Sequence, residues 1–277
     1  MLAAWEMAYR YQNVLGIDWK PYVFPAPSHV VDAMANMLNL YTFFGEPLHA
    51  GWPLGPVDGS ESKLVAGSLV GSPLVQANLI SGTRLIIGFV TSIALGGLLG
   101  LLMWTFKFLD ELLGPLFLGL QTLPSVCWVP LAILTLGINE RGIMFVLIMG
   151  SFFAVAIALR DGMRTIPPIY QRAGKMLGAH GWKFYRYVLL PASLPALASS
   201  LRQGFSFAWR SLMGAELIFM VSNRGVGFLL NIGREFSDVA QVIAVMIVMV
   251  GVGMLADKWL FGIFEKRVHS RFGLNVV

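Results

Sequence analysis

The chain has 277 residues, of which 56% are hydrophobic and 13% are charged, and its formal net charge at pH 7 is +5. Average soluble domains carry roughly 25% charged residues, so this chain has too few charges to cover the surface of a soluble protein. A mean hydropathy of +0.70 agrees. These values predict an integral membrane protein. The single cysteine, Cys127, excludes a disulfide framework and a thiolate metal cluster.

Other classes are disfavoured on similar grounds. The basic pI of about 9.5 is typical of a membrane protein with Lys and Arg in its cytoplasmic loops, and we expect no nucleic acid partner. We expect no metal site, because the histidines share no ligand spacing. They are His29, His49, His180 and His269. Residues 1–19 contain Glu6, Arg10 and Asp18, which argues against a cleavable signal peptide.

The N-terminal 75 residues hold no clear full crossing. Residues 1–19 are too short and too polar to span a membrane. Residues 28–40 predict an amphipathic helix on the outer interface or against the spans, with Ser28 as the N-cap after Pro27. Its apolar stripe consists of Val30, Val31, Met34, Met37 and Leu38. Residues 41–75 are rich in Gly, Pro and Ser and predict a loop.

Five membrane-spanning helices follow in the sequence. The stretches 85–106, 112–139, 142–159 and 239–256 contain no charged residue, and their runs are continuous rather than alternating, which favours helices. The stretch 112–139 is long enough to bend at Pro115, Pro124 or Pro130. A fifth span, 192–220, is apolar but interrupted by charges, which are Arg202, Arg210 and Glu216. The Gly96–Gly100 spacing predicts close helix packing.

The distribution of basic residues predicts the orientation. Loops 107–111 and 160–190 and the tail 257–277 hold eleven Lys and Arg residues. The positive-inside rule places this side in the cytoplasm, with the C-terminus inside and residues 41–75 outside.

The long loop 160–190 has helical patterns of its own. Pro167 and Pro168 open a short helix, whose positions 170, 173, 174 and 177 share one face that is small in the middle, so another surface can approach closely. Gly178 ends the helix, since glycine readily adopts positive φ. A second helical run contains positions 182, 185 and 188 and is expected to end at Pro191. The loop therefore predicts a helix–turn–helix that a soluble partner can grip.

This loop resembles the cytoplasmic signature of bacterial ABC importer permeases. That signature is Glu-Ala-Ala, three residues, Gly, nine residues, then an aliphatic residue, any residue and Leu-Pro. The corresponding residues here are Arg172-Ala173-Gly174, Gly178 and Val188-Leu189-Leu190-Pro191. Both spacings match. Arg172 replaces the acidic residue, and Gly174 replaces the second alanine.

The resemblance covers about residues 20–270 and is greatest to the nitrate/sulfonate/taurine/bicarbonate subgroup. Segments 24–28, 129–132 and 215–217, together with Arg84, Gly88-Phe89, Pro124 and Trp209, resemble that subgroup's helices and turns. Family members usually have a full helix before the pair seen here as Trp5-Glu6, so this chain is expected to start late. Residues 41–75 look longer than is usual.

The resemblance implies an all-α polytopic membrane bundle of the type I importer permease fold, in the bacterial inner membrane. It also implies partners: a pair of ABC ATPase subunits, an extracytoplasmic solute-binding protein and a second permease copy, with a homodimer favoured. ATP and Mg would belong to the ATPase, because this sequence has no phosphate-binding loop, and no cofactor, catalytic residue or metal is expected in this chain. The expected ATPase-coupling residues are Tyr170, Arg172, Ala173, Gly174, Leu177, Gly178, Ala179, Trp182 and Pro191.

The candidate translocation pathway is predicted from polar residues within the spans. Gln121 and Ser125 flank Pro124, where freed carbonyls and side chains can face a cavity. Arg210 lies in the middle of its span, where a charge faces the bundle interior by default. It either contacts an anion in the pathway or forms a structural ion pair with another helix. Glu216 is six residues further, about 240° around the helix, and is expected to serve a gate or packing role.

The leading function is a permease subunit for a small anion: nitrate, bicarbonate or an organic sulfonate. A neutral small organic solute and a non-transporting membrane scaffold remain alternatives, whereas an intramembrane enzyme would need clustered ionisable groups that the spans lack. Three parts are expected. Residues 1–75 are expected to hold a helix remnant, the amphipathic helix and an extracytoplasmic loop. Residues 76–264 are expected to form the permease domain, with its coupling loop at 160–190. Residues 265–277 are expected to form a cytoplasmic tail.

Overall fold

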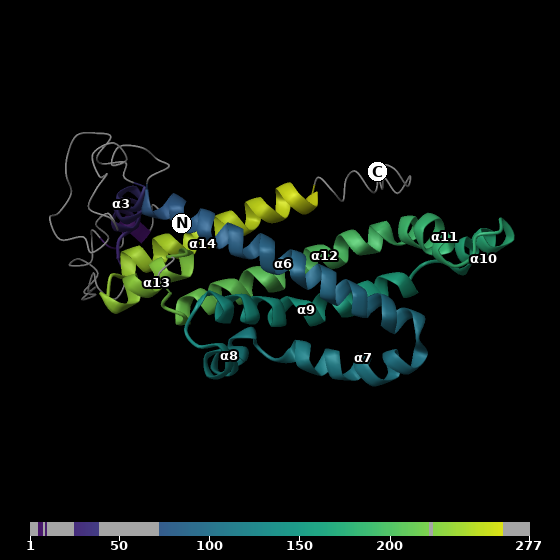
Figure 1. Ribbon diagram of the computed structural model, residues 1–277. Helices are drawn as coiled ribbons and strands as arrows, with labels where there is room; N and C mark the ends of the chain where they lie inside the picture. The colour runs from purple at the N-terminus through teal and green to yellow at the C-terminus, as the bar shows by residue number, and fades with distance from the viewer. Residues whose placement is uncertain (1–4, 8, 10–24, 39–71, 222–223, 263–277) are drawn as a thin grey trace, which may run out of the picture. The chain divides into compact units, whose positions relative to one another are not determined.

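The computed structural model describes residues 5–7, 9, 25–38, 72–221 and 224–262, in which every regular element is a helix (Figure 1). After α3 (Pro27–Met37), the long α6 (Pro73–Thr105) precedes α7 (Lys107–Thr122). A 3-10 turn, η2 (Ser125–Cys127), leads into α8 (Trp128–Leu136) and α9 (Glu140–Arg164). The remaining elements are α10 (Pro168–Met176), α11 (Trp182–Phe184), the π-helical η3 (Tyr185–Leu189), α12 (Leu190–Ile218), α13 (Val226–Glu235), α14 (Val239–Ala256) and the π-helical η4 (Asp257–Phe261).

The predicted all-α membrane architecture is confirmed. Within the described residues, three helices are long and apolar enough to cross a membrane: Pro73–Thr105, Glu140–Arg164 and Val239–Trp259. The bent pair formed by α7 and η2–α8 adds a fourth crossing if it is one broken span. Although α12 is a continuous helix of 29 residues, it is not in this apolar group. The count of five spans therefore stays a prediction.

The chain divides into two compact units. The first combines residues 1–83 with 216–251 and holds α3, the start of α6, α13 and most of α14. The second combines residues 84–215 with 252–277 and holds the rest of α6, the helices α7 to α11 and nearly all of α12. The predicted boundaries at 75 and 264 stay predictions. Most of the predicted 1–19 segment, residues 39–71 and the tail 265–277 lie outside the described residues.

The helix α9 is the buried centre of the second unit. Its buried positions include Val146, Leu147, Phe153 and Ala156, and α7 and α8 lie against it (Figure 1). Two of the glycines of α6, Gly96 and Gly100, permit a close approach to α9, since a Cβ at Gly96 would lie 2.7 Å from the Phe152 carbonyl oxygen. A Cβ at Gly100 would lie 2.5 Å from the Ala156 carbonyl oxygen. The close packing predicted from their spacing is therefore confirmed.

Ion pairs hold both ends of α9. At its start, Arg84 of α6 donates from Nε to Glu140 at 2.9 Å, although Arg84 is only 6% exposed. At its end, Arg160 donates to Asp110 of α7 at 3.3 Å, and Arg164 pairs with the same carboxylate. Buried charges persist only when they are paired, so these contacts fix α6 and α7 along α9.

The predicted crossing 112–139 is two helices, not one. α7 and η2–α8 meet at an angle of 97°, and the break falls at Pro124. Leu123 has an extended conformation (φ −66°, ψ 127°), as expected for a residue before proline. Pro115 lies inside α7 and Pro130 in the first turn of α8 without ending either helix. The expected bend therefore has a single cause among the three prolines.

The helix α3 confirms the predicted amphipathic segment but corrects its cap. The N-cap is Ala26, Pro27 is the first helical residue, and the backbone N–H of Ser28 donates to Glu6 at 3.3 Å instead. Proline suits this position because the N–H it lacks would have had no partner within the helix. Val30 and Met37 are buried as expected, but the buried face runs through Ala33 and leaves Val31 64% exposed.

Candidate functional site

The loop between α9 and α12 forms the predicted helix–turn–helix. The helix α10 starts after Pro167, and Gly178 ends it with a φ of +80°. The Ala179 N–H donates to the Gly174 carbonyl and the Gly178 N–H to the Lys175 carbonyl, both at 3.0 Å. This is the pattern by which glycine closes a helix, and it confirms the role predicted for Gly178.

The chain itself covers the predicted small face of α10 at one position only. Gly174 is buried, and a Cβ added there would lie 2.7 Å and 2.9 Å from the two methyl carbons of Val188 in η3. The other three positions of that face, 170, 173 and 177, are exposed. Gly174, where the family signature has alanine, thus accommodates a β-branched residue on the neighbouring helix.

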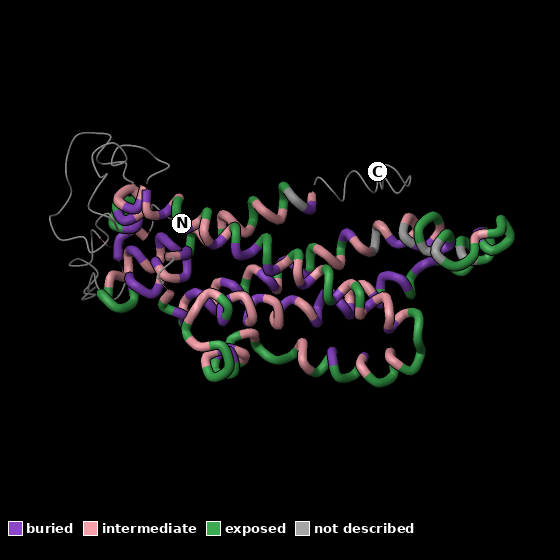
Figure 2. The backbone as a smooth tube through the Cα atoms, in the orientation of Figure 1, coloured by how far each residue is buried: buried purple, intermediate pink, exposed green. Residues whose placement is uncertain are grey.

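Several large side chains of the same helix are left uncovered. Ile169 and Tyr170 are 70% and 56% exposed, and Met176 and Leu177 are each 88% exposed. Arg172 and Ala173 are also exposed, so α10 presents a continuous accessible surface (Figure 2). An exposed apolar surface of this kind on an ordered element marks an interaction site.

The second half of the loop differs from the prediction at Pro191. The chain runs from α11 through the π-helical η3 directly into α12, so Pro191 is the second residue of α12 rather than the end of a helix. The helix is continuous through this position, and the wider π turn before Pro191 accommodates the ring and the missing N–H. Trp182 is the first residue of α11.

The exposed face of α12 is polar along its length. Apart from Ile218, its exposed side chains among the described residues are Ser199, Arg202, Gln203, Ser206 and Arg210. At 100° per residue they fall within an arc of about 100°, on one side of the helix. We call this row the α12 polar stripe. Arg202 in the stripe donates from Nε to Asp257 of η4 at 2.7 Å.

Arg210 has only local contacts within the described chain. Its Nε donates to the Ser206 carbonyl at 3.0 Å, and its guanidinium lies 4.7 Å from the centroid of the Phe207 ring. No ion pair joins it to a described carboxylate. The described residues therefore offer no carboxylate for the structural ion pair, which was one of the two interpretations of Arg210.

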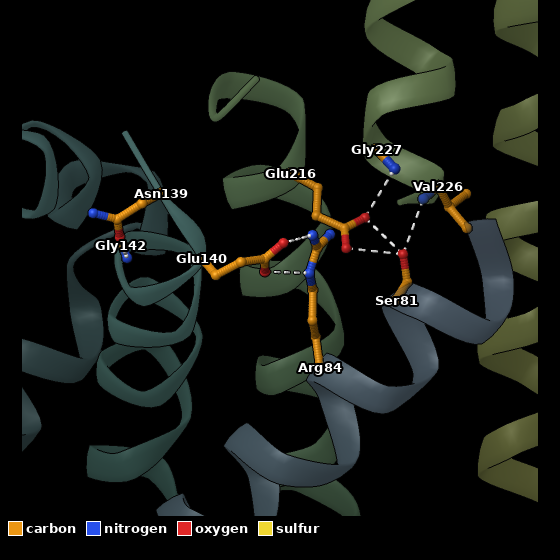
Figure 3. Close-up of polar contacts among 8 residues, drawn as sticks. All are labelled: Ser81, Arg84, Asn139, Glu140, Gly142, Glu216, Val226 and Gly227. Atoms are coloured by element: carbon orange, nitrogen blue, oxygen red, sulfur yellow. Dashed lines mark hydrogen bonds and ion pairs between the residues drawn. The ribbon is translucent and has the colours of Figure 1, made fainter. Parts of the chain in front are cut away.

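Glu216 stabilises the start of α13. It is 2% exposed, and its carboxylate accepts hydrogen bonds from the Ser81 hydroxyl at 2.7 Å and from the Gly227 N–H at 3.1 Å (Figure 3). The Ser81 hydroxyl in turn accepts from the Val226 N–H at 2.9 Å. A carboxylate at a helix N-terminus is favoured by the unpaired N–H groups and the helix dipole.

Glycine makes room for that carboxylate. A Cβ at Gly227 would lie 2.5 Å from the Cβ of Glu216, and one at Gly225 would overlap its carboxylate. The geometry matches the packing role predicted for Glu216. Sequence reasoning did not identify Ser81 as its partner, and no local signal in the sequence joins the two residues.

After the bend at Pro124, one predicted pathway residue and a second serine pack against α9, and the expected cavity beside Gln121 and Ser125 stays a prediction. The side chains of Ser125 in η2 and Ser211 in α12 both face Gly150 of α9, where a Cβ would lie 3.1 Å from that of Ser125 and would overlap the Ser211 hydroxyl. The Ser211 hydroxyl and the Gln121 carbonyl oxygen are buried without a hydrogen-bond partner among the described residues. Ser211, missed in the sequence, follows Arg210 directly.

No three His, Cys, Asp or Glu side chains in the described parts of the chain lie close enough to hold a metal ion. The architecture is similar to that of a chain in an inward-facing crystal form of the MetNI methionine ABC transporter. That match has a TM-score of 0.60 at 16% identity and covers 70% of this chain and 95% of the other. It supports the fold alone.

Sequence comparisons agree with the fold. A putative ABC transporter permease protein of Methanocaldococcus jannaschii is 32% identical over 72% of this chain and 74% of its own length. The nitrate import permease protein NrtB of Synechocystis is 27% identical over 64% of each chain. The bicarbonate transport system permease protein CmpB of Synechococcus elongatus is 28% identical over 68% of this chain and 67% of its own. A family model described as "Binding-protein-dependent transport system inner membrane component" matches residues 88–270. The chain therefore belongs to the family of inner membrane components of binding-protein-dependent transport systems.

Proposed function

We propose that two copies of this permease form the pathway by which a small anion such as nitrate or bicarbonate enters the cell. Relatives named as nitrate and bicarbonate permeases support the anion class. The observation that carries the proposal is the α12 polar stripe with Arg210 in it. This cation is exposed and has no carboxylate partner in the described chain.

The position of Arg210 argues for a second copy. A charge in the middle of a membrane helix costs about 2.5 to 3.5 kcal/mol or more when it faces lipid, and such residues face a bundle interior or a water-filled cavity. The single chain leaves Arg210 and its stripe uncovered. A second copy that presents the same stripe would enclose a polar passage with an arginine on each side.

The exposed surface of α10 suits the ATPase partner. In this proposal the ATPase pair grips the loop through the exposed residues Tyr170, Arg172, Ala173 and Leu177. It holds the ATP and Mg itself and transmits its closure through η3 into α12. The same arrangement places this loop and the C-terminus in the cytoplasm, and a solute-binding protein docks on the other side. The chain itself binds no cofactor in this scheme.

Arg210 provides the test. Uptake of labelled nitrate, bicarbonate and taurine would be measured in proteoliposomes with the assembled transporter, comparing Arg210→Gln, Arg210→Lys and the wild type. Arg141→Gln is the matched control, because Arg141 is exposed in the first turn of α9. We expect Gln to abolish anion uptake without loss of assembly, and Lys to restore part of it. Unchanged anion uptake in Arg210→Gln overturns the proposed anion pathway. Uptake of a neutral solute in the absence of any anion uptake would instead support a permease for neutral solutes.

A further inference from the structure

A cavity of about 410 Å³ opens where the end of α6 meets the loop after α10. Its aromatic walls are Trp104 and Phe184, Thr105 closes α6 beside it, and Lys175 and the short loop 179–181 complete the lining. The volume lies in the range of ligand-binding pockets, which is about 300 to 1,000 Å³. None of these residues belongs to the α12 polar stripe.

The polar groups in this cavity suit an anion. Lys175 lies 6.0 Å from the centroid of the Phe184 ring and forms no ion pair with a described carboxylate. His180 donates from Nδ1 to the Gly178 carbonyl at 3.0 Å, which fixes the orientation of the imidazole ring. Gly178 and Gly181 both have positive φ, so the turn that presents His180 has a defined shape.

The loop that forms most of the cavity is basic. No Asp or Glu occurs from residue 162 to residue 190, whereas this stretch contains five Arg and Lys residues. Basic clusters within a turn or two of a membrane span attract anionic lipid headgroups, at about 1 kcal/mol for each residue near the surface. The loop side of the cavity is therefore positively charged, and the acidic residues Asp110 and Glu111 follow its α6 side in the sequence.

The base of the cavity is apolar and adjoins a membrane span. Phe184 packs with Met163, Ile166 and Leu189, and Trp104 of α6 packs against the same cluster. Trp104 and Thr105 are the last residues of a 33-residue apolar helix, and tryptophan concentrates at the membrane interface. A ligand with an anionic head and a hydrocarbon body matches this combination of surfaces.

We propose that this cavity binds the phosphodiester headgroup of an anionic phospholipid. Lys175 would contact the phosphate, and the acyl chains would follow the exposed apolar side of α6, which includes Leu95 and Leu98. The proposal rests on the membrane location of the chain and is independent of which solute is carried.

The test measures lipid retention by the purified permease. Delipidated protein would be incubated with dioleoylphosphatidylglycerol or dioleoylphosphatidylcholine, and the bound lipid would be counted by native mass spectrometry. We compare Lys175→Gln with Lys183→Gln, which removes the same charge from an exposed residue of the same loop outside the cavity. Lys175→Arg keeps the charge and serves as a check on folding.

We expect wild type to retain phosphatidylglycerol over phosphatidylcholine, and Lys175→Gln to lose about five-fold in retention, the effect of one surface charge. Lys175→Arg should retain the lipid, and Lys183→Gln should lose less retention than Lys175→Gln. Equal retention of both lipids, or equal loss in both Gln variants, overturns the proposal. Full displacement of the lipid by glycerol phosphate would show that the cavity binds a free phosphate ester. Loss of the lipid on ATPase binding would show that the ATPase occupies the cavity. Either result also overturns the proposal.

Discussion

The exposed sides of α14 and α12 differ in chemistry. The exposed residues of α14 include Ile247, Val250 and Met254, all more than half exposed and all apolar. The exposed residues of α12 form the polar stripe. Contact with lipid is favourable for the apolar surface of α14 and costs free energy for the polar and charged surface of α12. Exposed residues in the single chain therefore indicate different surroundings. The exposed side of α14 suits a helix that faces lipid, whereas the exposed side of α12 suits a helix that faces a protein partner or water.

The largest effect, on membrane insertion, is expected when an arginine like that of the α12 polar stripe is introduced on the exposed side of α14. Val250→Arg places a cation in the middle of an apolar span, at about 2.5 to 3.5 kcal/mol, or roughly 100-fold in the insertion equilibrium. The measurement is the membrane-inserted fraction, with Val250→Leu as the control. Arg210→Gln should leave insertion unchanged. Normal insertion of Val250→Arg would mean that this side of α14 also faces a polar space.

The buried acid of α12 should contribute to stability rather than to transport. Glu216→Leu removes the acceptor of the Ser81 hydroxyl and the Gly227 N–H, and each buried group left unpaired costs about 1 to 3 kcal/mol. We expect a clear fall in the thermal unfolding midpoint of the detergent-solubilised permease. Arg210→Gln should leave that midpoint near the wild-type value. A stable Glu216→Leu protein with impaired uptake would assign Glu216 to the gate instead.

A third exposed surface, on α10, is apolar but lies beyond the membrane spans, so a protein partner should cover it. Leu177→Ser should weaken the affinity of the permease for its ATPase about ten-fold, a typical effect for a buried interface anchor. Ile138→Ser changes another side chain that is more than half exposed, just before the start of α9 and so at the opposite end of α9 from the loop, and should have no effect. Affinity would be measured by titrating labelled ATPase. Equal effects of both variants would argue against α10 as the docking surface.

Local signals in the sequence predicted most of the fold. Charge-free runs located the helices, and Gly178 and Pro124 ended them, because a positive φ and a missing N–H act on the backbone at their own positions. Pro191 was misread, since its effect depends on the π turn before it. The Glu216 site could not be predicted, because Ser81 is 135 residues away in the chain and Gly225 and Gly227 matter only through their contact with the carboxylate.

The smallest expected effect separates the two arginines of the stripe. Arg202 is paired with Asp257, whereas Arg210 has no such partner among the described residues, so Arg202→Gln should change anion uptake much less than Arg210→Gln does. Asp257→Asn should act in the opposite direction, because it removes the negative charge beside Arg202 and makes the stripe more positive, which raises the local concentration of an anion. We expect a modest fall in the apparent KM for the anion at low ionic strength, and a smaller fall at high salt, where the field is screened. A raised KM would mean that the Arg202–Asp257 pair positions α12 rather than setting its charge, and the anion preference would then depend on Arg210 alone.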